Sequence, residues 1–204
     1  MADVSLLAWD IGGVLLSDGW DREQRRAAYR HFGVDEAEFE RRHASVVDPF
    51  ERGRLSLDDY LRRVVGPTTP PAELAEWRRF VFEQSVADEE MLSMARDVRE
   101  DASYLFVALN DESREVNLHR IREFRLAGLF DVFLSSCFTG LRKPSEEAFR
   151  LLLDVSQRDP SQVAFIDDRP ENVEAAARSG MRSIHFHGAG PLRAELERVG
   201  VRVG

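Results

Sequence analysis

The sequence has few of the features that mark secreted or membrane proteins. It contains one cysteine, Cys137, among 204 residues, so an internal disulfide is impossible and a reducing compartment is favoured. It has no apolar run long enough to span a bilayer, and its start, M-A-D-V-S, lacks the basic residues of a signal peptide. These absences predict a cytoplasmic protein.

Basic charge is also scarce. The 28 Lys and Arg residues face 37 Asp and Glu residues, which gives a formal net charge of −9. Nucleic acids and anionic membranes bind basic faces, so we expect neither as a partner. A small phosphorylated metabolite is compatible with this charge, because a local pocket can be positive on an acidic protein.

The sequence does contain an alternation of short apolar runs and helical patterns. Its length and 43% hydrophobic content suit one α/β unit with a sizeable insertion. Alternating strands and helices predict a parallel sheet with right-handed crossovers, so the expected fold class is α/β with a Rossmann-like three-layer core. Strands are expected at residues 4–10, 104–109, 132–135, 163–166 and 182–186, and helices at 88–99, 113–123, 145–155, 171–179 and 191–198.

Four helical patterns follow the first strand with no strand between them. They begin near Asp21, Asp35 and Ser56, which are good helix caps, and at Ala72. The first is expected to span residues 21–32, the second 35–43 and the fourth 72–84. Consecutive helices of this kind indicate a helical insertion. We expect a cap over residues 18–85 and a core built from residues 1–17 and 86–204.

The end of the first strand is the most informative stretch of the chain. Residues 5–16 are S-L-L-A-W-D-I-G-G-V-L-L, so Asp10 ends an apolar strand and Gly12 and Gly13 follow it. A carboxylate at the end of a buried strand is costly unless something satisfies it. The glycines allow a tight turn, and the backbone N–H groups of Ile11 and Gly12 can then approach an anion.

Polar side chains follow the later strands as well: Asn110, Lys143, and Asp167 with Asp168. The carboxyl ends of parallel strands meet at one edge of a sheet, so these groups are expected to lie together. Carboxylates suit Mg²⁺, which prefers oxygen ligands. Lys143 would offset the charge of Asp10 and of a phosphoryl group, to which the Asn110 amide can donate a hydrogen bond.

Together these motifs resemble the haloacid dehalogenase superfamily over nearly the whole chain. W-D-I-G-G-V-L-L is similar to its first motif, A-L-N-D to its second, L-R-K-P to its third and F-I-D-D-R-P-E-N-V to its fourth. Within the helical insertion, F-E-R-G-R-L-S-L-D-D-Y resembles the small cap of the branch that includes the phosphatase domain of soluble epoxide hydrolase and sugar-1-phosphate phosphatases. The resemblance implies a cap that closes over the strand ends.

The resemblance also implies a role for each matching residue. Asp10 is expected to be the nucleophile that forms an aspartyl phosphate, with Lys143 holding the nucleophile and the phosphate. The expected ligands of Mg²⁺ are Asp10, Asp167, Asp168 and the backbone carbonyl of Gly12. The remaining expected contacts are phosphate binding by Ile11, Gly12, Asn110, Asp111 and Lys143, and support of the acidic loop by Asn172.

Two positions depart from the family's pattern. Its phosphatases usually carry a second Asp two residues after the nucleophile, which protonates the leaving oxygen and then activates water; here that residue is Gly12. The second motif usually has Ser or Thr, whereas here it has Asn110, which keeps a hydrogen-bond donor. A good leaving group, a cap residue or a bound water can replace the missing acid. Asp18 and Asp21 are nearby candidates, although helix capping is the favoured role of Asp21.

These departures leave three functions open. The favoured one is a Mg²⁺-dependent phosphatase that acts on a small organic phosphate through Asp10. The second is a haloacid dehalogenase-type hydrolase, because a halide leaves without a proton; the pair Asp167 and Asp168 argues against it. The third is a catalytically weak homologue that binds a metabolite or a partner. Both a monomer and a homodimer stay open.

Cys137 and Trp20 have simpler expected roles. No base lies near Cys137 in the sequence, so a packed thiol is expected. Trp20 lies where the insertion leaves the core, and packing is favoured over a pocket-lining role.

Overall fold

A computed structural model describes residues 3–100 and 103–203 of the chain. The predicted core limits at Met1 and Gly204, and the first two residues of the M-A-D-V-S start, lie outside these ranges. Within the described ranges, no helix combines the length and the apolar character needed to cross a lipid bilayer.

The described residues contain one five-stranded sheet with the spatial order β3-β2-β1-β4-β5. All of its strand pairs are parallel, and β1 lies in the centre between β2 and β4. The strands are β1 (Leu6–Trp9), β2 (Leu105–Ala108), β3 (Val132–Phe133), β4 (Val163–Asp167) and β5 (Arg182–His185). The predicted α/β class is confirmed, and the carboxyl ends of β1 and β4 lie side by side.

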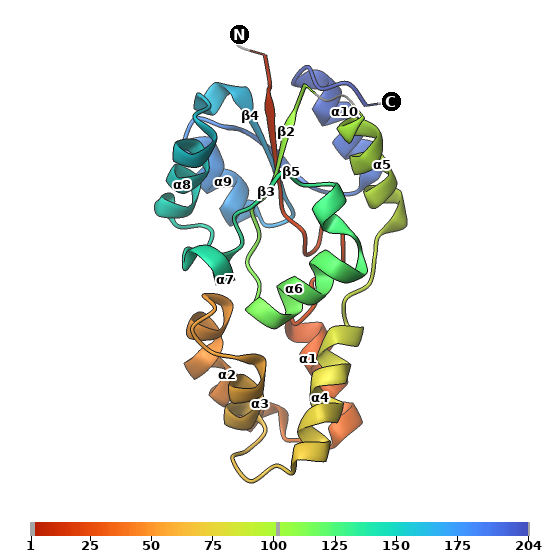
Figure 1. Cartoon of the computed structure of the whole chain (residues 1–204), viewed down its shortest axis with the longest axis vertical. Helices are drawn as coiled ribbons and strands as arrows, with labels where there is room; N and C mark the ends of the chain where they lie inside the picture. Colours follow the sequence, from red (N-terminus) through yellow and green to blue (C-terminus); the bar gives the residue numbers. More distant parts are fainter. Residues whose placement is uncertain (1–2, 101–102, 204) are drawn as a thin grey trace.

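Two helical layers cover the sheet (Figure 1). Successive residues of a strand point to opposite faces, so Leu7 and Trp9 of β1 contribute to one apolar cluster while Leu6 and Ala8 contribute to another. Helices α5 (Glu89–Arg99) and α10 (Ala189–Arg198) pack into the first cluster, and α8 (Glu146–Ser156) and α9 (Pro170–Arg178) into the second. The remaining core elements are α6 (Arg114–Glu123), α7 (Ser136–Thr139) and two 3₁₀ turns, Leu126–Gly128 and Pro160–Gln162.

Four helices form a cap beyond the carboxyl edge of the sheet (Figure 1). They are α1 (Arg22–Phe32), α2 (Glu36–Glu51), α3 (Leu57–Val64) and α4 (Pro71–Glu83). The cap has its own apolar cluster, in which Trp77 stacks on Phe32 at 3.9 Å and Tyr60 stacks on Phe50 at 4.1 Å between ring centroids. Its helix starts agree with the sequence, because Asp21, Asp35 and Ser56 each accept a hydrogen bond at a helix N-terminus.

The sequence-based prediction was wrong at two elements. The second cap helix was expected to end at residue 43, but α2 continues to Glu51 and includes Pro49. Val46 and Phe50 extend its buried face, so packing in the cap outweighs the loss of one backbone hydrogen bond at the proline. The strand expected at 132–135 ends at Phe133, and the chain turns into α7, which carries the buried Cys137.

The two connections between cap and core run side by side. Ser17 N–H donates to the Val86 carbonyl at 2.8 Å, and Leu16 bridges Ala87 in antiparallel register. The predicted limits at 17/18 and 85/86 fall at this pair of segments. The division of the chain into a cap and a core domain at these residues stays a prediction.

A buried histidine makes the stability of the cap depend on pH. The Tyr60 hydroxyl accepts a hydrogen bond from Trp20 Nε1 at 2.9 Å and lies within hydrogen-bond distance of His43 Nδ1, at 2.7 Å. Burial, with the charge of Arg25 nearby, lowers the pKa of His43 to about 4. The unfolded chain takes up this proton near pH 6.5 and the folded chain does not.

We expect this difference to lower the free energy of unfolding by about 2–3 kcal/mol between pH 7 and pH 4.5. Urea unfolding of the wild type and of His43→Gln at both pH values checks this. The variant should lose less stability than the wild type as pH falls. Equal losses in the two proteins would contradict the prediction.

Candidate active site

Three predicted site residues meet at the carboxyl edge of the sheet. Asp10 follows β1, Asp167 ends β4, and Lys143 comes from the loop between α7 and α8. Lys143 Nζ lies 2.8 Å from Asp10 Oδ2 and 2.6 Å from Asp167 Oδ2, and the lysine side chain is 2% exposed. Lys143 is the single lysine of a chain whose other basic side chains are arginines. A compact ammonium group fits between two carboxylates where a planar guanidinium does not.

The acidic groups form a cluster suited to a cation. Asp10, Asp167 and Asp168 each offer a carboxylate oxygen, and these oxygens all lie within 4.8 Å of one another. Asp168 Oδ1 is buried and has no hydrogen-bond partner. A buried carboxylate oxygen without a partner is costly, so its position fits a bound cation better than an unoccupied protein interior.

The acidic loop is held from several sides. Asp167 Oδ1 accepts hydrogen bonds from Asn172 Nδ2 and from the Arg169 backbone N–H, both at 2.9 Å. The Asn172 contact is the support that the sequence predicted. His185 Nε2 lies 2.9 Å from the Asp168 carbonyl, to which it can only donate.

The charges of Asp10 and Lys143 depend on each other. Burial raises the pKa of Asp10 to about 8, against the lowering effect of Lys143. Burial alone would lower the pKa of Lys143, but the carboxylates of Asp10 and Asp167 outweigh it and raise that pKa. Lys143 is therefore a permanent cation. Further positive charge at the acidic cluster would favour the ionised form of Asp10, which is the form that acts as a nucleophile.

Asn110 has protein partners for its side chain in this structure. Its side chain is buried in a polar network: Nδ2 donates to Asn117 Oδ1 at 3.1 Å, and Oδ1 accepts from the Ser135 hydroxyl at 2.7 Å. Asn110 is not among the residues that line the cavity described below, and phosphate binding by Asn110 stays a prediction. Asp111 does line the cavity, and its carboxylate accepts a hydrogen bond from the backbone N–H of Lys143 at 3.3 Å.

The predicted backbone donors have different surroundings. Ile11 N–H donates to Asp10 Oδ1 at 2.7 Å, so it orients the carboxylate in this structure. Gly12 borders the cavity directly. Phosphate binding by Ile11 and Gly12 stays a prediction.

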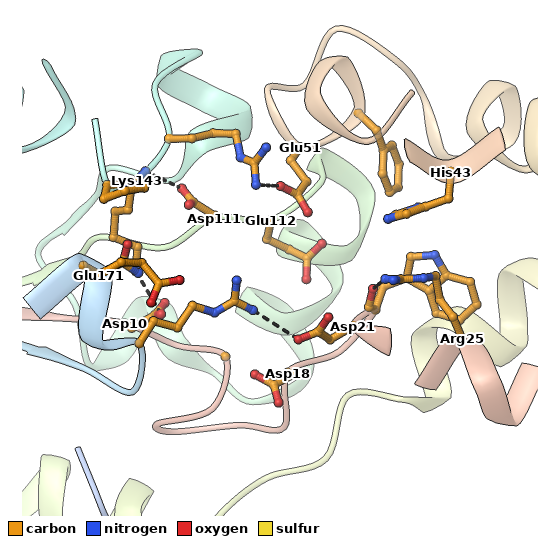
Figure 2. Close-up of a pocket in the computed structure, with 17 residues that line it drawn as sticks. Asp10, Asp18, Asp21, Arg25, His43, Glu51, Asp111, Glu112, Lys143 and Glu171 are labelled. Atoms are coloured by element: carbon orange, nitrogen blue, oxygen red, sulfur yellow. Dashed lines mark hydrogen bonds and ion pairs between the residues drawn. The ribbon is translucent and has the colours of Figure 1, made fainter. Parts of the chain in front are cut away.

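A cavity of about 300 Å³ lies between the strand ends and the cap. Figure 2 shows its polar side chains arranged around one space. The core contributes Asp10, Gly12, Asp111, Glu112, Arg142, Lys143, Pro144, Arg169, Glu171 and Asn172, and the connection and cap contribute Asp18, Trp20, Asp21, Arg25, His43, Phe50 and Glu51. Trp20 therefore both packs in the cap and lines the cavity.

A sequence model described as haloacid dehalogenase-like hydrolase matches residues 4–180. The chain belongs to this family of hydrolases.

Curated relatives of this hydrolase include named phosphatases. It is 28% identical over 141 residues to a sesquiterpene phosphatase of Aspergillus oryzae, covering 68% of this chain and 71% of that protein. It is 32% identical over 81 residues to a flavin mononucleotide hydrolase of Arabidopsis thaliana, covering 40% and 33%. It is 36% identical over 70 residues to bifunctional epoxide hydrolase 2 of Mus musculus, covering 34% of this chain and 13% of that longer protein.

A solved family structure has the same fold. An enzyme of Bacteroides thetaiotaomicron superposes with a TM-score of 0.77 at 18% identity, covering 95% of this chain and 98% of the other. The same enzyme is known in complex with magnesium and inorganic phosphate, with a TM-score of 0.75, 19% identity and coverage of 92% and 96%. This likeness confirms the fold of the hydrolase.

The cap of this hydrolase is tied to the core by ion pairs that sequence reasoning missed. Arg142, next to Lys143, pairs with Glu51 and lies 3.5 Å from Asp48, both on α2. Arg52 Nη1 donates to the Gly140 carbonyl at 2.6 Å. Burial raises the pKa of Glu51 to about 7. The signal for these contacts was the charged F-E-R-G-R segment, which places two of the residues in one motif.

The two aspartates proposed as replacements for the missing acid differ in position. Asp21 caps α1 and its Oδ2 lies 3.2 Å from Arg169 Nη2, so capping is confirmed. Asp18 lines the cavity and is accessible to solvent, and partial desolvation with the nearby charge of Asp21 raises its pKa. A Cβ at Gly13 would lie 3.0 Å from Asp18 Oδ1 and 2.5 Å from Asp168 Oδ2, so Asp18 approaches the acidic cluster.

Proposed function

We propose that this hydrolase is a Mg²⁺-dependent phosphatase of a small phosphorylated metabolite, with Asp10 as its nucleophile. One observation carries the proposal: Asp10 lines a cavity between the strand ends and the cap, beside a buried ammonium and a carboxylate oxygen that lacks a partner. The phosphatase and the flavin mononucleotide hydrolase among the relatives support phosphate esters as substrates.

The residues present divide the chemistry as follows. Asp10, Asp168, Asp167 and the Gly12 carbonyl would hold Mg²⁺, which supplies positive charge that offsets the phosphoryl oxygens. Lys143 keeps Asp10 oriented and contributes a second positive charge. Asp10 attacks phosphorus and displaces the leaving alcohol, which gives an aspartyl phosphate. Water then attacks that phosphorus, releases inorganic phosphate and restores the Asp10 carboxylate.

The cap gives the reaction its enclosure. The Arg142 and Arg52 contacts hold the end of α2 against α7 and the loop that follows it. An enclosed site excludes bulk water and strengthens the interaction of Lys143 with anionic groups. A cavity of about 300 Å³ suits a small substrate.

The test is phosphate release from a panel of small phosphomonoesters, including sugar 1-phosphates and acyl phosphates, with Mg²⁺ or with EDTA. Chloride release from 2-chloropropionate is measured in parallel. We expect phosphate release that EDTA abolishes, and no chloride release. Chloride release that persists in EDTA would establish the dehalogenase alternative, which Gly12 keeps open because a halide needs no proton. Binding of Mg²⁺ with neither activity would favour the weakly catalytic homologue.

Removal of one predicted metal ligand gives a separate prediction. Millimolar Mg²⁺ is expected to raise the melting temperature of the wild type by several degrees, because a ligand that binds the folded state stabilises it. Asp168→Asn should reduce that shift to near zero while remaining folded, since its buried oxygen has no protein partner to lose. Differential scanning calorimetry with and without EDTA checks this. An undiminished Mg²⁺ shift in the variant would contradict the assignment of Asp168.

A further inference from the structure

Gly12, at the position of the missing acid, leaves room for a side chain and faces the buried Arg120. A Cβ added to Gly12 would lie 3.6 Å from Arg120 Nη1 and from the Asp18 backbone, which is ordinary contact. Gly12 is also absent from the glycines with positive φ, whereas Gly13 has a φ of 71°. An aspartate at position 12 would therefore fit and would point toward Arg120. Position 12 therefore has a cationic neighbour suited to a carboxylate, although the residue there is glycine.

Arg120 is held rigidly at this point. It projects from α6 and is 1% exposed. Nε lies 3.0 Å from the Ser85 hydroxyl, and Nη2 donates to the Ser17 carbonyl at 2.9 Å. The remaining guanidinium nitrogen, Nη1, forms an ion pair with Glu112 and lies 3.3 Å from its Oε2.

Glu112 lies in the loop between β2 and α6, and β2 is the strand next to β1, which precedes the nucleophile. Trp9 of β1 pairs with Ala108 of β2, so Glu112 emerges just beyond the carboxyl end of β2. Ser113 N–H and the Ser113 hydroxyl donate to Oε1 at 2.7 and 3.1 Å, which fixes the side chain. Glu112 lines the cavity, and Figure 2 shows its carboxylate within the same space as Asp10 and Glu51.

We propose that Glu112 supplies the acid and base function that the residue at Gly12 lacks, with Arg120 as its positioning residue. The inference rests on the proposed phosphatase activity. In the first step Asp10 attacks phosphorus, the bond from phosphorus to the leaving oxygen breaks, and that oxygen takes the Glu112 proton. In the second step the Glu112 carboxylate takes a proton from the water that attacks the aspartyl phosphate, which restores both carboxyl groups.

Two other acidic groups of the cavity have different surroundings. Asp18 lies beside the acidic cluster, since a Cβ at Gly13 would be 3.0 Å from Asp18 Oδ1 and 2.5 Å from Asp168 Oδ2, and Glu51 pairs with Arg142 at the cap contact. Burial raises the pKa of Glu112, with Arg120 opposing the shift. A shift in this direction favours the protonated form, which is the form that a general acid requires.

The test compares leaving groups. A general acid matters for a poor leaving group such as an alkoxide, and matters little for 4-nitrophenolate. Glu112→Gln is expected to lower kcat/KM for an alkyl phosphate by about 10²–10³-fold and for 4-nitrophenyl phosphate by less than about 10-fold. Glu123→Gln, at an exposed carboxylate of α6, the helix that carries Arg120, is the matched control and should retain both activities.

A second variant separates catalysis from folding. Gly12→Asp placed in the Glu112→Gln background should recover at least about 10-fold of the alkyl phosphatase activity, because it returns a carboxylate to the neighbourhood of Arg120. Equal losses on both substrates, or no loss with Glu112→Gln, would overturn the inference while leaving the phosphatase intact. No phosphate release by the wild type and by Glu123→Gln would overturn the proposed function, and the inference with it.

Discussion

Asp10→Asn is expected to lower kcat/KM for phosphate ester hydrolysis by at least about 10³-fold, because an amide oxygen is a poor nucleophile in place of a carboxylate. The substitution preserves the shape of the side chain and its acceptor toward Ile11 N–H, which lies 2.7 Å from Oδ1. The loss should appear in kcat, since substrate contacts to Lys143 and the cap remain. Steady-state phosphate release by both proteins checks this.

Asp97→Asn provides the control for this measurement. Asp97 is an exposed carboxylate on α5, remote from the cavity lining, so its variant should release phosphate at the wild-type rate. Asp10→Asn with more than a tenth of the wild-type rate would contradict the assignment of the nucleophile.

Lys143→Met is expected to lower the free energy of unfolding by about 3–5 kcal/mol in EDTA, because it leaves two buried carboxylates without their shared cation. Asp167 is fully buried and Asp10 is 7% exposed, so water compensates for the lost ammonium only in part. Mg²⁺ should restore part of the loss, since it would return positive charge to the same carboxylates. Urea unfolding with EDTA and with Mg²⁺ measures both effects.

Arg62→Met is the comparison for that measurement. Arg62 lies 3.7 Å from Asp59 in a pair whose side chains are 49% and 58% exposed, so its removal should cost less than about 1 kcal/mol. A Lys143→Met variant as stable as Arg62→Met would show that the buried ammonium does not compensate Asp10 and Asp167.

The side chains that gather at the carboxyl edge of the sheet could be predicted because their positions depend on local sequence patterns. Asp10 and Asp167 follow apolar strands, and a parallel sheet places all such ends together. Helix starts were equally accessible, since Asp35 and Ser56 act through bonds to their own next turn. The lone lysine was a further signal, because a chain that otherwise uses arginine has a lysine only where Asp10 and Asp167 meet.

The remaining features depend on contacts between distant segments. Nothing local shows that Asn110 turns toward Asn117 and Ser135 and away from the cavity. The Glu112–Arg120 pair matches no motif, and its meaning appears only when Gly12 is seen beside it. The contacts of the cap with the core likewise join α2 to a loop some ninety residues later, as Arg52 and Gly140 do.

The most direct test of the central claim is to trap the covalent intermediate. The protein is mixed with 4-nitrophenyl phosphate and Mg²⁺, quenched in acid within milliseconds, digested and analysed by mass spectrometry. The account predicts a phosphoryl group on the peptide that contains Asp10, absent in EDTA and in Asp10→Asn. Phosphate release at the wild-type rate with no phosphoryl group on Asp10, or with the group on another residue, would contradict it.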